Sequence, residues 1–139
     1  MLELVLDTNV LVAALRSSLG ASHRLLETLE QQVWHPVISL ALALEYEAVL
    51  KRGAVEIGLT LSEIDELIEY LCSRSRLIQV YFLWRPVLHD ADDDRILELA
   101  VRAGCTIVTF NSRHFAGAER FGVSVMSPKE ALALIGGRK

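Results

Sequence analysis

Short apolar runs alternate along the chain with segments of helical periodicity. The runs span residues 4–6, 33–38, 77–82, 105–109 and 123–126. Short apolar runs that end abruptly at polar residues are typical of strands buried on both faces of a parallel sheet. Strands that alternate with helices predict an α/β sandwich with a mostly parallel central sheet of four to five strands. Pro36 interrupts the second run, so we expect this strand at a sheet edge or with an irregular end.

The segments between the runs predict helices with recognisable ends. Ser39 is a suitable N-cap, and Gly53 is expected to end the helix that follows. Ser62, with Asp65 three residues later, predicts the start of the next helix. Ser127 and Glu130 flank Pro128 and Lys129 as a capping box. The expected helices cover residues 10–16, 21–32, 40–51, 62–74, from the acidic residues near 90 to 103, and from 128 onward.

Length and composition predict one folded domain over residues 1–139. Hydrophobic residues make up 52% of the 139 positions, which is enough for an ordinary core. No apolar run approaches the ~20 residues that a membrane span needs. The first residues lead directly into the first strand without a basic leader segment, so we expect a cytoplasmic protein. Cys72 and Cys105 are expected to be small core residues and not a disulfide framework.

The charge balance limits the classes of partner. The formal net charge is -4 at pH 7, and this argues against indiscriminate binding to nucleic acid, which needs a concentrated basic surface. A local basic rim remains compatible with this balance. A pool of acidic side chains would produce the same balance and would attract divalent cations.

Asp7 directly follows the first apolar run. Ligands of open α/β sheets bind outside the carboxyl ends of the strands, where the winding direction changes, so a carboxylate at this position is a candidate functional group. The alternative is that Asp7 only caps the helix that begins near Val10. This stretch by itself favours neither interpretation.

Two further acids fall on apolar helix faces, where a charge is costly without a partner. Glu45 has only apolar neighbours at three and four residues' distance, whereas Glu47 has Lys51 at i+4 and is expected to be solvated. Asp93 begins the inward stripe of its helix. The alternatives are a glutamate at the core edge, and acids that merely complement the helix dipole. Asp92, near Arg95, and Asp94, near Glu98, are expected to face outward.

The four predicted strands place these groups at one edge of the sheet. Asp7 follows the first strand, Glu45 lies in the helix after the second, Asp93 follows the third and Asn111 follows the fourth. Carboxylates about 4 Å apart repel by several kcal/mol, so a cluster persists only with a cation or a shared proton. Hard oxygen ligands suit Mg²⁺ or Mn²⁺, and no Cys/His spacing indicates zinc. Such an ion activates water and stabilises charge on a phosphoryl group.

Four segments together resemble the PIN-domain ribonucleases, close to the VapC-like toxins of bacterial and archaeal type II toxin–antitoxin pairs. The resemblance covers nearly the whole chain and implies a PIN-like α/β/α sandwich. It also implies a metal-dependent enzyme that hydrolyses phosphodiester bonds of single-stranded or loop RNA. The segments are VLDTNVLVAAL, ISLALALEYEAVL, DADDDRILELAVRAGCTIVTFNSRHF and VSVMSPKEAL.

The resemblance assigns roles to individual residues. The catalytic and metal-binding acids of the family fall on Asp7, Glu45 and Asp93, the same three that the strand and helix patterns select. The fourth acidic position is Asn111, which has one charge fewer, and Asp90 or Asp92 is a candidate to compensate for it. Thr8, Asn9 and Thr109 are the residues expected to hold the carboxylates. Candidates for RNA contact, each with an ordinary surface or packing role as its alternative, are Arg113, His114, Arg85, Arg16, Arg24 and Trp84.

The resemblance also implies an antitoxin partner and a homodimer. The stripe of Ile64, Leu67, Ile68 and Leu71 is a candidate contact face, with core packing as its alternative. The pattern leaves two other functions to consider. A haloacid-dehalogenase phosphatase would need a second Asp at position 9, where Asn9 stands. A degenerate PIN scaffold would bind RNA or a protein without cleavage, and Asn111 keeps this alternative open.

Overall fold

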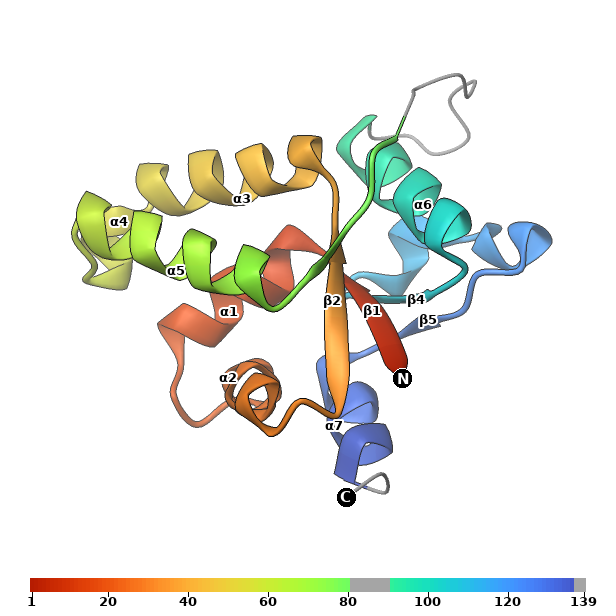
Figure 1. Ribbon diagram of the computed structural model, residues 1–139, viewed down its shortest axis with the longest axis horizontal. Helices are drawn as coiled ribbons and strands as arrows, with labels where there is room; N and C mark the ends of the chain where they lie inside the picture. The colour runs from red at the N-terminus through yellow and green to blue at the C-terminus, as the bar shows by residue number, and fades with distance from the viewer. Residues whose placement is uncertain (81–90, 137–139) are drawn as a thin grey trace.

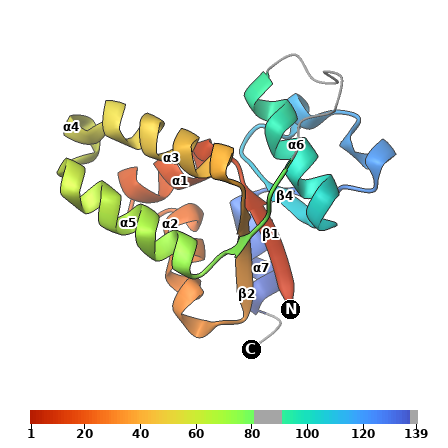
Figure 2. The ribbon, with the colours of Figure 1, turned by 45° about the horizontal axis from the view of Figure 1, so that its top comes forward.

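A computed structural model describes residues 1–80 and 91–136 of the chain, with the side chains of residues 91 and 92 left out. Five strands form one sheet in the order β3-β2-β1-β4-β5. All four neighbouring pairs are parallel. Helices cover both faces of this sheet: α6 lies on one side, and α1, α2, α3 and α5 lie on the other (Figures 1 and 2). The predicted α/β sandwich is therefore confirmed.

The central strand is the first in the chain. In β1, Leu4, Val5 and Leu6 are at most 1% exposed, as expected for a strand covered on both faces. Leu4 pairs with Pro36 on one side and with Thr106 on the other. The strands span Leu2–Leu6 (β1), Trp34–Ile38 (β2), Arg76–Leu77 (β3), Thr106–Val108 (β4) and Val125–Met126 (β5).

The third strand differs from its prediction. It was expected over residues 77–82, but β3 is limited to Arg76–Leu77, and residues 81–90 lie outside the described part. This strand pairs only with the last two residues of β2, Val37 and Ile38. Pro36 therefore lies in a strand that is second from the edge and only partly covered by β3, which explains how it is tolerated.

Most helices begin and end near the predicted residues. Their bounds are Thr8–Arg16 (α1), Ala21–Glu27 (α2), Leu40–Arg52 (α3), Ala54–Ile57 (α4), Leu61–Ser73 (α5), Ala91–Ala103 (α6) and Pro128–Gly136 (α7), with 3₁₀ turns at Thr28–Gln31 (η1), Ser112–Phe115 (η2) and Ala118–Phe121 (η3). The single helix expected over 21–32 is divided into α2 and η1, and α4 was not predicted. Gln32 ends η1 in the left-handed region at φ 56°.

Side-chain caps determine several of these bounds. The Ser39 hydroxyl accepts a hydrogen bond from the Leu42 N–H at 3.1 Å, which confirms the predicted start of α3. The predicted start of α5 at Ser62 is wrong, because Thr60 is the N-cap and forms a reciprocal capping box with Glu63. A glutamate three residues after the cap can reach back to the cap N–H, and Glu63 does so at 2.9 Å.

The apolar stripe of α5 belongs to the core. Ile64 and Leu71 are at most 1% exposed, and Leu67 and Ile68 are partly buried against the core. The candidate dimer face at this stripe is therefore used for packing between α5 and α3. Cys72 and Cys105 are free and partly buried, and burial raises the pKa of the Cys105 thiol to about 12. None of the helices described here is long and apolar enough to cross a membrane.

Thr60 and Ser62 provide a direct test of the α5 start. Thr60→Ala removes the acceptor for the Glu63 N–H and is expected to lower the free energy of unfolding by about 1 kcal/mol. Ser62→Ala changes an exposed position inside the first turn and should alter stability by less than about 0.5 kcal/mol. Urea unfolding of both variants measures the difference. A larger loss for Ser62→Ala would contradict the observed cap.

Candidate active site at the carboxyl edge of the sheet

The strand order places a change of winding direction between β1 and β4. From β1 the chain continues to β2 and β3 on one side, and β4 and β5 follow on the other side. Parallel sheets bind ligands at such a switch point, outside the carboxyl ends of the strands. Asp7 follows β1 at this point and Thr109 follows β4. The Thr109 hydroxyl donates to Asp7 Oδ2 at 2.7 Å, across 102 positions of sequence.

A chain of hydrogen bonds fixes the direction of the Thr109 hydroxyl. The backbone N–H of Asn111 donates to Thr109 Oγ1 at 3.0 Å, and Thr109 in turn donates to Asp7. Asp7 occupies the N-cap position of α1, yet its carboxylate makes no side-chain capping hydrogen bond. The capping interpretation therefore accounts for the place of Asp7 and for the nearby N–H groups of Thr8 and Asn9, but not for its hydrogen bond with Thr109.

Burial dominates the electrostatics of Asp7. The residue is 7% exposed, and loss of hydration raises the pKa of its carboxyl above the ordinary value. The Thr109 hydrogen bond, the backbone N–H groups of Thr8 and Asn9, and the charge of His114 oppose this rise without cancelling it. Asp7 is thus a desolvated acid whose negative form is costly in the protein itself.

Glu45 reaches the same edge from α3. It is half-buried beside the stripe of Leu42, Tyr46 and Leu50 that packs α3 on the core. Its Oε2 accepts a short hydrogen bond from the hydroxyl of Thr8, the residue that follows Asp7. Thr8, one of the residues expected to hold the carboxylates, thus contacts Glu45. Glu47, by contrast, pairs with Lys51 at 3.3 Å as expected for a surface residue.

Tyr46 was not selected from the sequence. Its side chain is 1% exposed, and its hydroxyl donates to the Leu6 carbonyl at 2.5 Å, directly before Asp7. Burial and then the charges of Asp7 and Glu45 raise the pKa of the Tyr46 phenol well above its ordinary value. The charges of both carboxylates therefore affect the pKa of the same phenol. A tyrosine in the middle of an apolar helical stripe was the available signal, because its hydroxyl needs a buried partner.

Asp93 and His114 close the site on the other side of the sheet. Asp93, near the start of α6, has a side chain only 14% exposed, and its Oδ2 lies 3.6 Å from Nδ1 of His114. The charge of His114 also lowers the pKa of Asp7. His114 is thus close to both Asp93 and Asp7, just as Tyr46 is close to both Glu45 and Asp7. Each of the other two predicted acids therefore shares a neighbouring residue with Asp7.

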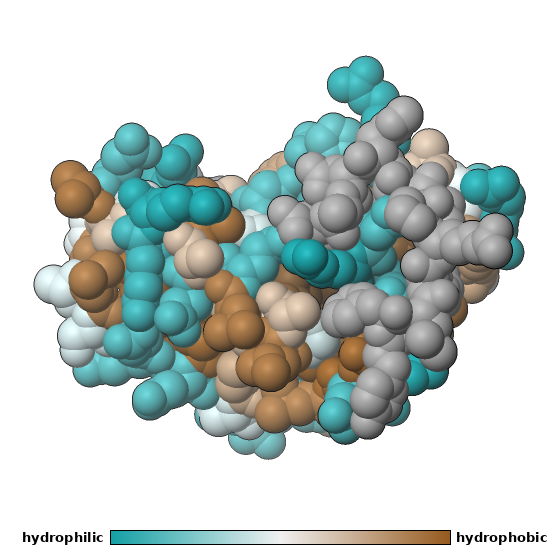
Figure 3. All heavy atoms as spheres, turned by 90° about the horizontal axis from the view of Figure 1, so that it is seen from above, coloured by the Kyte–Doolittle hydropathy of each residue, from teal (hydrophilic) through white to brown (hydrophobic). Residues whose placement is uncertain are grey.

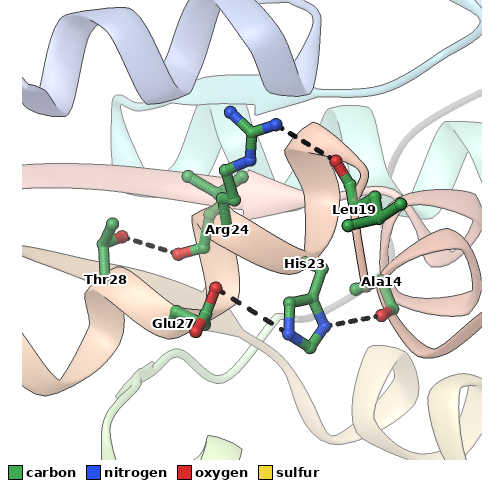
Figure 4. Close-up of polar contacts among 7 residues, drawn as sticks. Ala14, Leu19, His23, Arg24, Glu27 and Thr28 are labelled. Atoms are coloured by element: carbon green, nitrogen blue, oxygen red, sulfur yellow. Dashed lines mark hydrogen bonds and ion pairs between the residues drawn. The ribbon is translucent and has the colours of Figure 1, made fainter. Parts of the chain in front are cut away.

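Several other predicted residues have different places. Arg16 forms an exposed ion pair with Glu56 at 3.1 Å. Arg24 donates to the Leu19 carbonyl at 3.2 Å, in a group of polar contacts between α2 and the end of α1 (Figure 4). Arg113 is exposed in η2, beside His114. Asp90, Arg85 and Trp84 lie outside the described residues.

The α6 helix buries an acid that the sequence pattern placed outside. Asp94 was expected to face outward beside Glu98, but Glu98 is 6% exposed and Asp94 is partly buried. Ile96, Leu97, Leu99 and Ala100 are also buried, so the second half of α6 is enclosed over most of its circumference. An apolar stripe predicts burial of a single helix face, so it could not predict burial around most of α6. The buried side chain of Glu98 is not without an interaction partner in this environment.

A sequence model of the PIN domain matches residues 3–113, which is most of the chain. The chain belongs to the PIN domain family. Its fold is similar to a chain of the crystal structure of VapBC2 from Rickettsia felis bound to a DNA fragment from their promoter. The TM-score is 0.62 at 16% sequence identity, and the match covers 91% of this chain and 98% of that one. A comparison with curated proteins finds no match.

This membership confirms the PIN-like fold and does not support the haloacid-dehalogenase alternative. Figure 3 looks down on the carboxyl edge of this PIN domain, where hydrophilic side chains lie across the middle of the face. The donors at this edge are carboxylate and amide oxygens, which suit a hard divalent cation. Asn9 Oδ1 is buried with no hydrogen-bond partner among the described residues, as expected of an oxygen available to a ligand or water.

The acids are not assembled into a finished metal cage. Among the described side chains, no three His, Cys, Asp or Glu residues are arranged to hold a metal ion. Glu45 engages Thr8, and Asp93 faces His114. Joint ligation of one ion by all three acids would require these side chains to reorient. Their joint ligation therefore stays a prediction.

The raised pKa of Asp7 gives a prediction for the chelator-treated protein. Its folded form keeps the proton to higher pH than its unfolded form, so stability falls as pH rises through this interval. Asp7→Asn removes the cost of the buried charge and should raise the melting temperature at pH 7, on the order of a few degrees. The gain should shrink as pH falls toward 3.8, the ordinary value for this carboxyl.

Calorimetry in EDTA at several pH values measures this effect. Glu119→Gln, at an exposed position, is the control and should change the melting temperature little at any pH. An unchanged or lower melting temperature of Asp7→Asn at pH 7 would show that burial of this carboxylate costs the fold nothing.

Proposed function

We propose that this PIN domain is a metal-dependent endoribonuclease. The observation that supports this most directly is the buried carboxylate of Asp7 at the switch point, positioned by Thr109. Glu45 and Asp93 each share a neighbouring side chain with Asp7, namely Tyr46 and His114. Burial makes the charge of Asp7 costly, and a cation would offset that cost. Family membership supports a nuclease in general.

Asp7, Glu45 and Asp93 are the proposed ligands of Mg²⁺ or Mn²⁺, with Asn111 as a further oxygen donor. When bound, such an ion would neutralise charge on the phosphoryl group and lower the pKa of water. Asp7 supplies a ligand whose position is set before binding, because Thr109 and Asn111 fix its orientation. Glu45 and Asp93 would each supply a carboxylate, from side chains that contact Thr8 and His114.

The cationic residues of η2 are proposed to receive the RNA backbone. Arg113 is exposed, and the His114 side chain is 59% exposed beside Asp93. If Asp93 ligated a cation, the imidazole of His114 would be available to a phosphate oxygen. His114 therefore has two alternative anionic partners at one place.

We also propose that the protein is a cytoplasmic toxin of a toxin–antitoxin pair, with an antitoxin partner and a homodimer as its working unit. The support is the fold likeness to a chain of the VapBC2 structure, which is bound to promoter DNA. An adjacent gene for a small DNA-binding protein, and copurification of its product with this chain, would test the antitoxin part.

The competing candidate is a PIN scaffold that binds RNA or protein without cleavage. Asn111 favours it, because an amide stands where the family has a fourth acid. The exposed position of Asn111 after Thr109 is compatible with both candidates. Cleavage assays distinguish them.

Glu45 and Glu47 form a matched pair for this assay, since they lie on the same helix two residues apart. Purified protein is expected to cleave RNA with Mn²⁺ or Mg²⁺ and not with EDTA. Glu45→Gln should lower the cleavage rate on the order of 100-fold or more. Glu47→Gln loses only a surface pair with Lys51 and should retain the native rate. Equal rates for the two variants would exclude Glu45 from the site.

Metal binding has a readout that does not depend on RNA. Mn²⁺ at about 100 times its dissociation constant should raise the free energy of unfolding by about 2.7 kcal/mol. Thermal unfolding with and without Mn²⁺ measures this gain for the native protein and for Asp93→Asn, with Asp65→Asn in the surface pair with Lys51 as the control. The gain should be lost only in Asp93→Asn. The same gain in all three proteins would place the ion elsewhere.

A further inference from the structure

Phe110 is an exposed aromatic residue at the carboxyl edge of β4. It lies between Thr109, which is 2% exposed and bonded to Asp7, and Asn111, whose N–H donates to Thr109. Successive Cα atoms are about 3.8 Å apart, so the backbone of Phe110 borders the candidate active site directly. Its own exposure is 53%, whereas nearby Phe115 is 1% exposed and packs in the core.

The segment that contains Phe110 differs from the rest of this edge. Residues 110–114 are all exposed, and they combine the aromatic ring with an amide, a hydroxyl, Arg113 and His114. One end of the segment is fixed by the Thr109 hydrogen bond, and His114 near the other end faces Asp93. The segment therefore runs along the rim of the acidic site, with its ring and its cations on exposed positions.

The charge of the protein makes a neutral contact valuable here. The chain has a formal net charge of -4, and the acids at the site repel phosphates, so attraction between backbone charges alone is a weak source of affinity for RNA. Stacking of a base on an aromatic ring needs no charge and contributes about 1–3 kcal/mol per base. In a duplex the base faces are already occupied by neighbouring pairs, so this contact is limited to unpaired nucleotides.

We propose that Phe110 is a substrate-binding residue that stacks on an unpaired base of RNA beside the bond to be cleaved. The stack places the nucleotide at the rim, while Arg113 and His114 receive its phosphate. Phe110 thereby gives the site its preference for single-stranded over double-stranded RNA. This inference rests on the proposed ribonuclease function and adds the residue that selects the substrate form.

The experiment measures RNA binding in the Asp7→Asn background, where cleavage does not consume the ligand. Fluorescence anisotropy gives dissociation constants for a short single-stranded oligoribonucleotide and for the corresponding duplex, in Mg²⁺. A single-stranded oligonucleotide that carries 2-aminopurine reports stacking of the base through quenching of its fluorescence. Melting temperatures check that each variant is folded.

Replacing Phe110 distinguishes the effect of an aromatic ring on binding from the effect of side-chain size. Phe110→Ala and Phe110→Leu should both weaken binding of the single strand, on the order of 10- to 100-fold, and abolish the quenching. Phe110→Tyr and Phe110→Trp should preserve both. Binding of the duplex should change little in all four variants. Phe121→Ala, which alters another partly exposed ring (39%) at the end of η3, should match the parent protein.

Native affinity in Phe110→Leu or Phe110→Ala, an equal loss in Phe121→Ala, or no RNA binding by the parent would each overturn the proposal. Cleavage by the native protein is measured separately. If RNA binding depends on the aromatic ring but the native protein does not cleave RNA, the role of Phe110 stands and the proposed nuclease function is overturned. If the native protein cleaves RNA but binding does not depend on the ring, the nuclease function stands and the role of Phe110 is overturned.

Discussion

The hydrogen bond from Thr109 to Asp7 joins the ends of two neighbouring parallel strands. The main chain reinforces it, because the Asp7 N–H donates to the Val108 carbonyl at 2.9 Å and extends the pairing of β1 and β4 by one residue. Tyr46 fixes the Leu6 carbonyl from the opposite direction. Asp7 is therefore positioned by the sheet and by the core, and not by a loop. A carboxylate that is costly to bury is kept there by contacts that stabilise the fold as a whole.

The other two acids are held differently. Glu45 and Asp93 project from α3 and α6, and their observed partners are a hydroxyl and an imidazole. Side chains can change rotamer at little cost compared with a displacement of paired strands, so these two acids are the adjustable members of the site. Such an arrangement reduces repulsion among three carboxylates, since each negative charge has a separate neighbour.

The sequence predicted the parts of the structure that depend on local pattern. Asp7 was found because a buried strand must end where polar residues begin, and Ser39 because the cap and its helix are adjacent. The start of α5 was misplaced because Thr60 and Ser62 each precede an acid by three residues. Only Glu63 made the reciprocal bond. Tyr46 and Glu98 were missed because their environment comes from other elements. Their burial depends on packing against strands and turns far away in the chain.

Pro36 has a consequence for the backbone donors of β2. The Ile38 carbonyl points to β3, where it accepts from Ile78, so by the alternation of a strand Pro36 faces the same side, before β3 begins. Pro36 is buried, and β3 pairs only with Val37 and Ile38. Any other residue would therefore bury an N–H for which β3 supplies no partner, and proline spares the strand this unsatisfied donor.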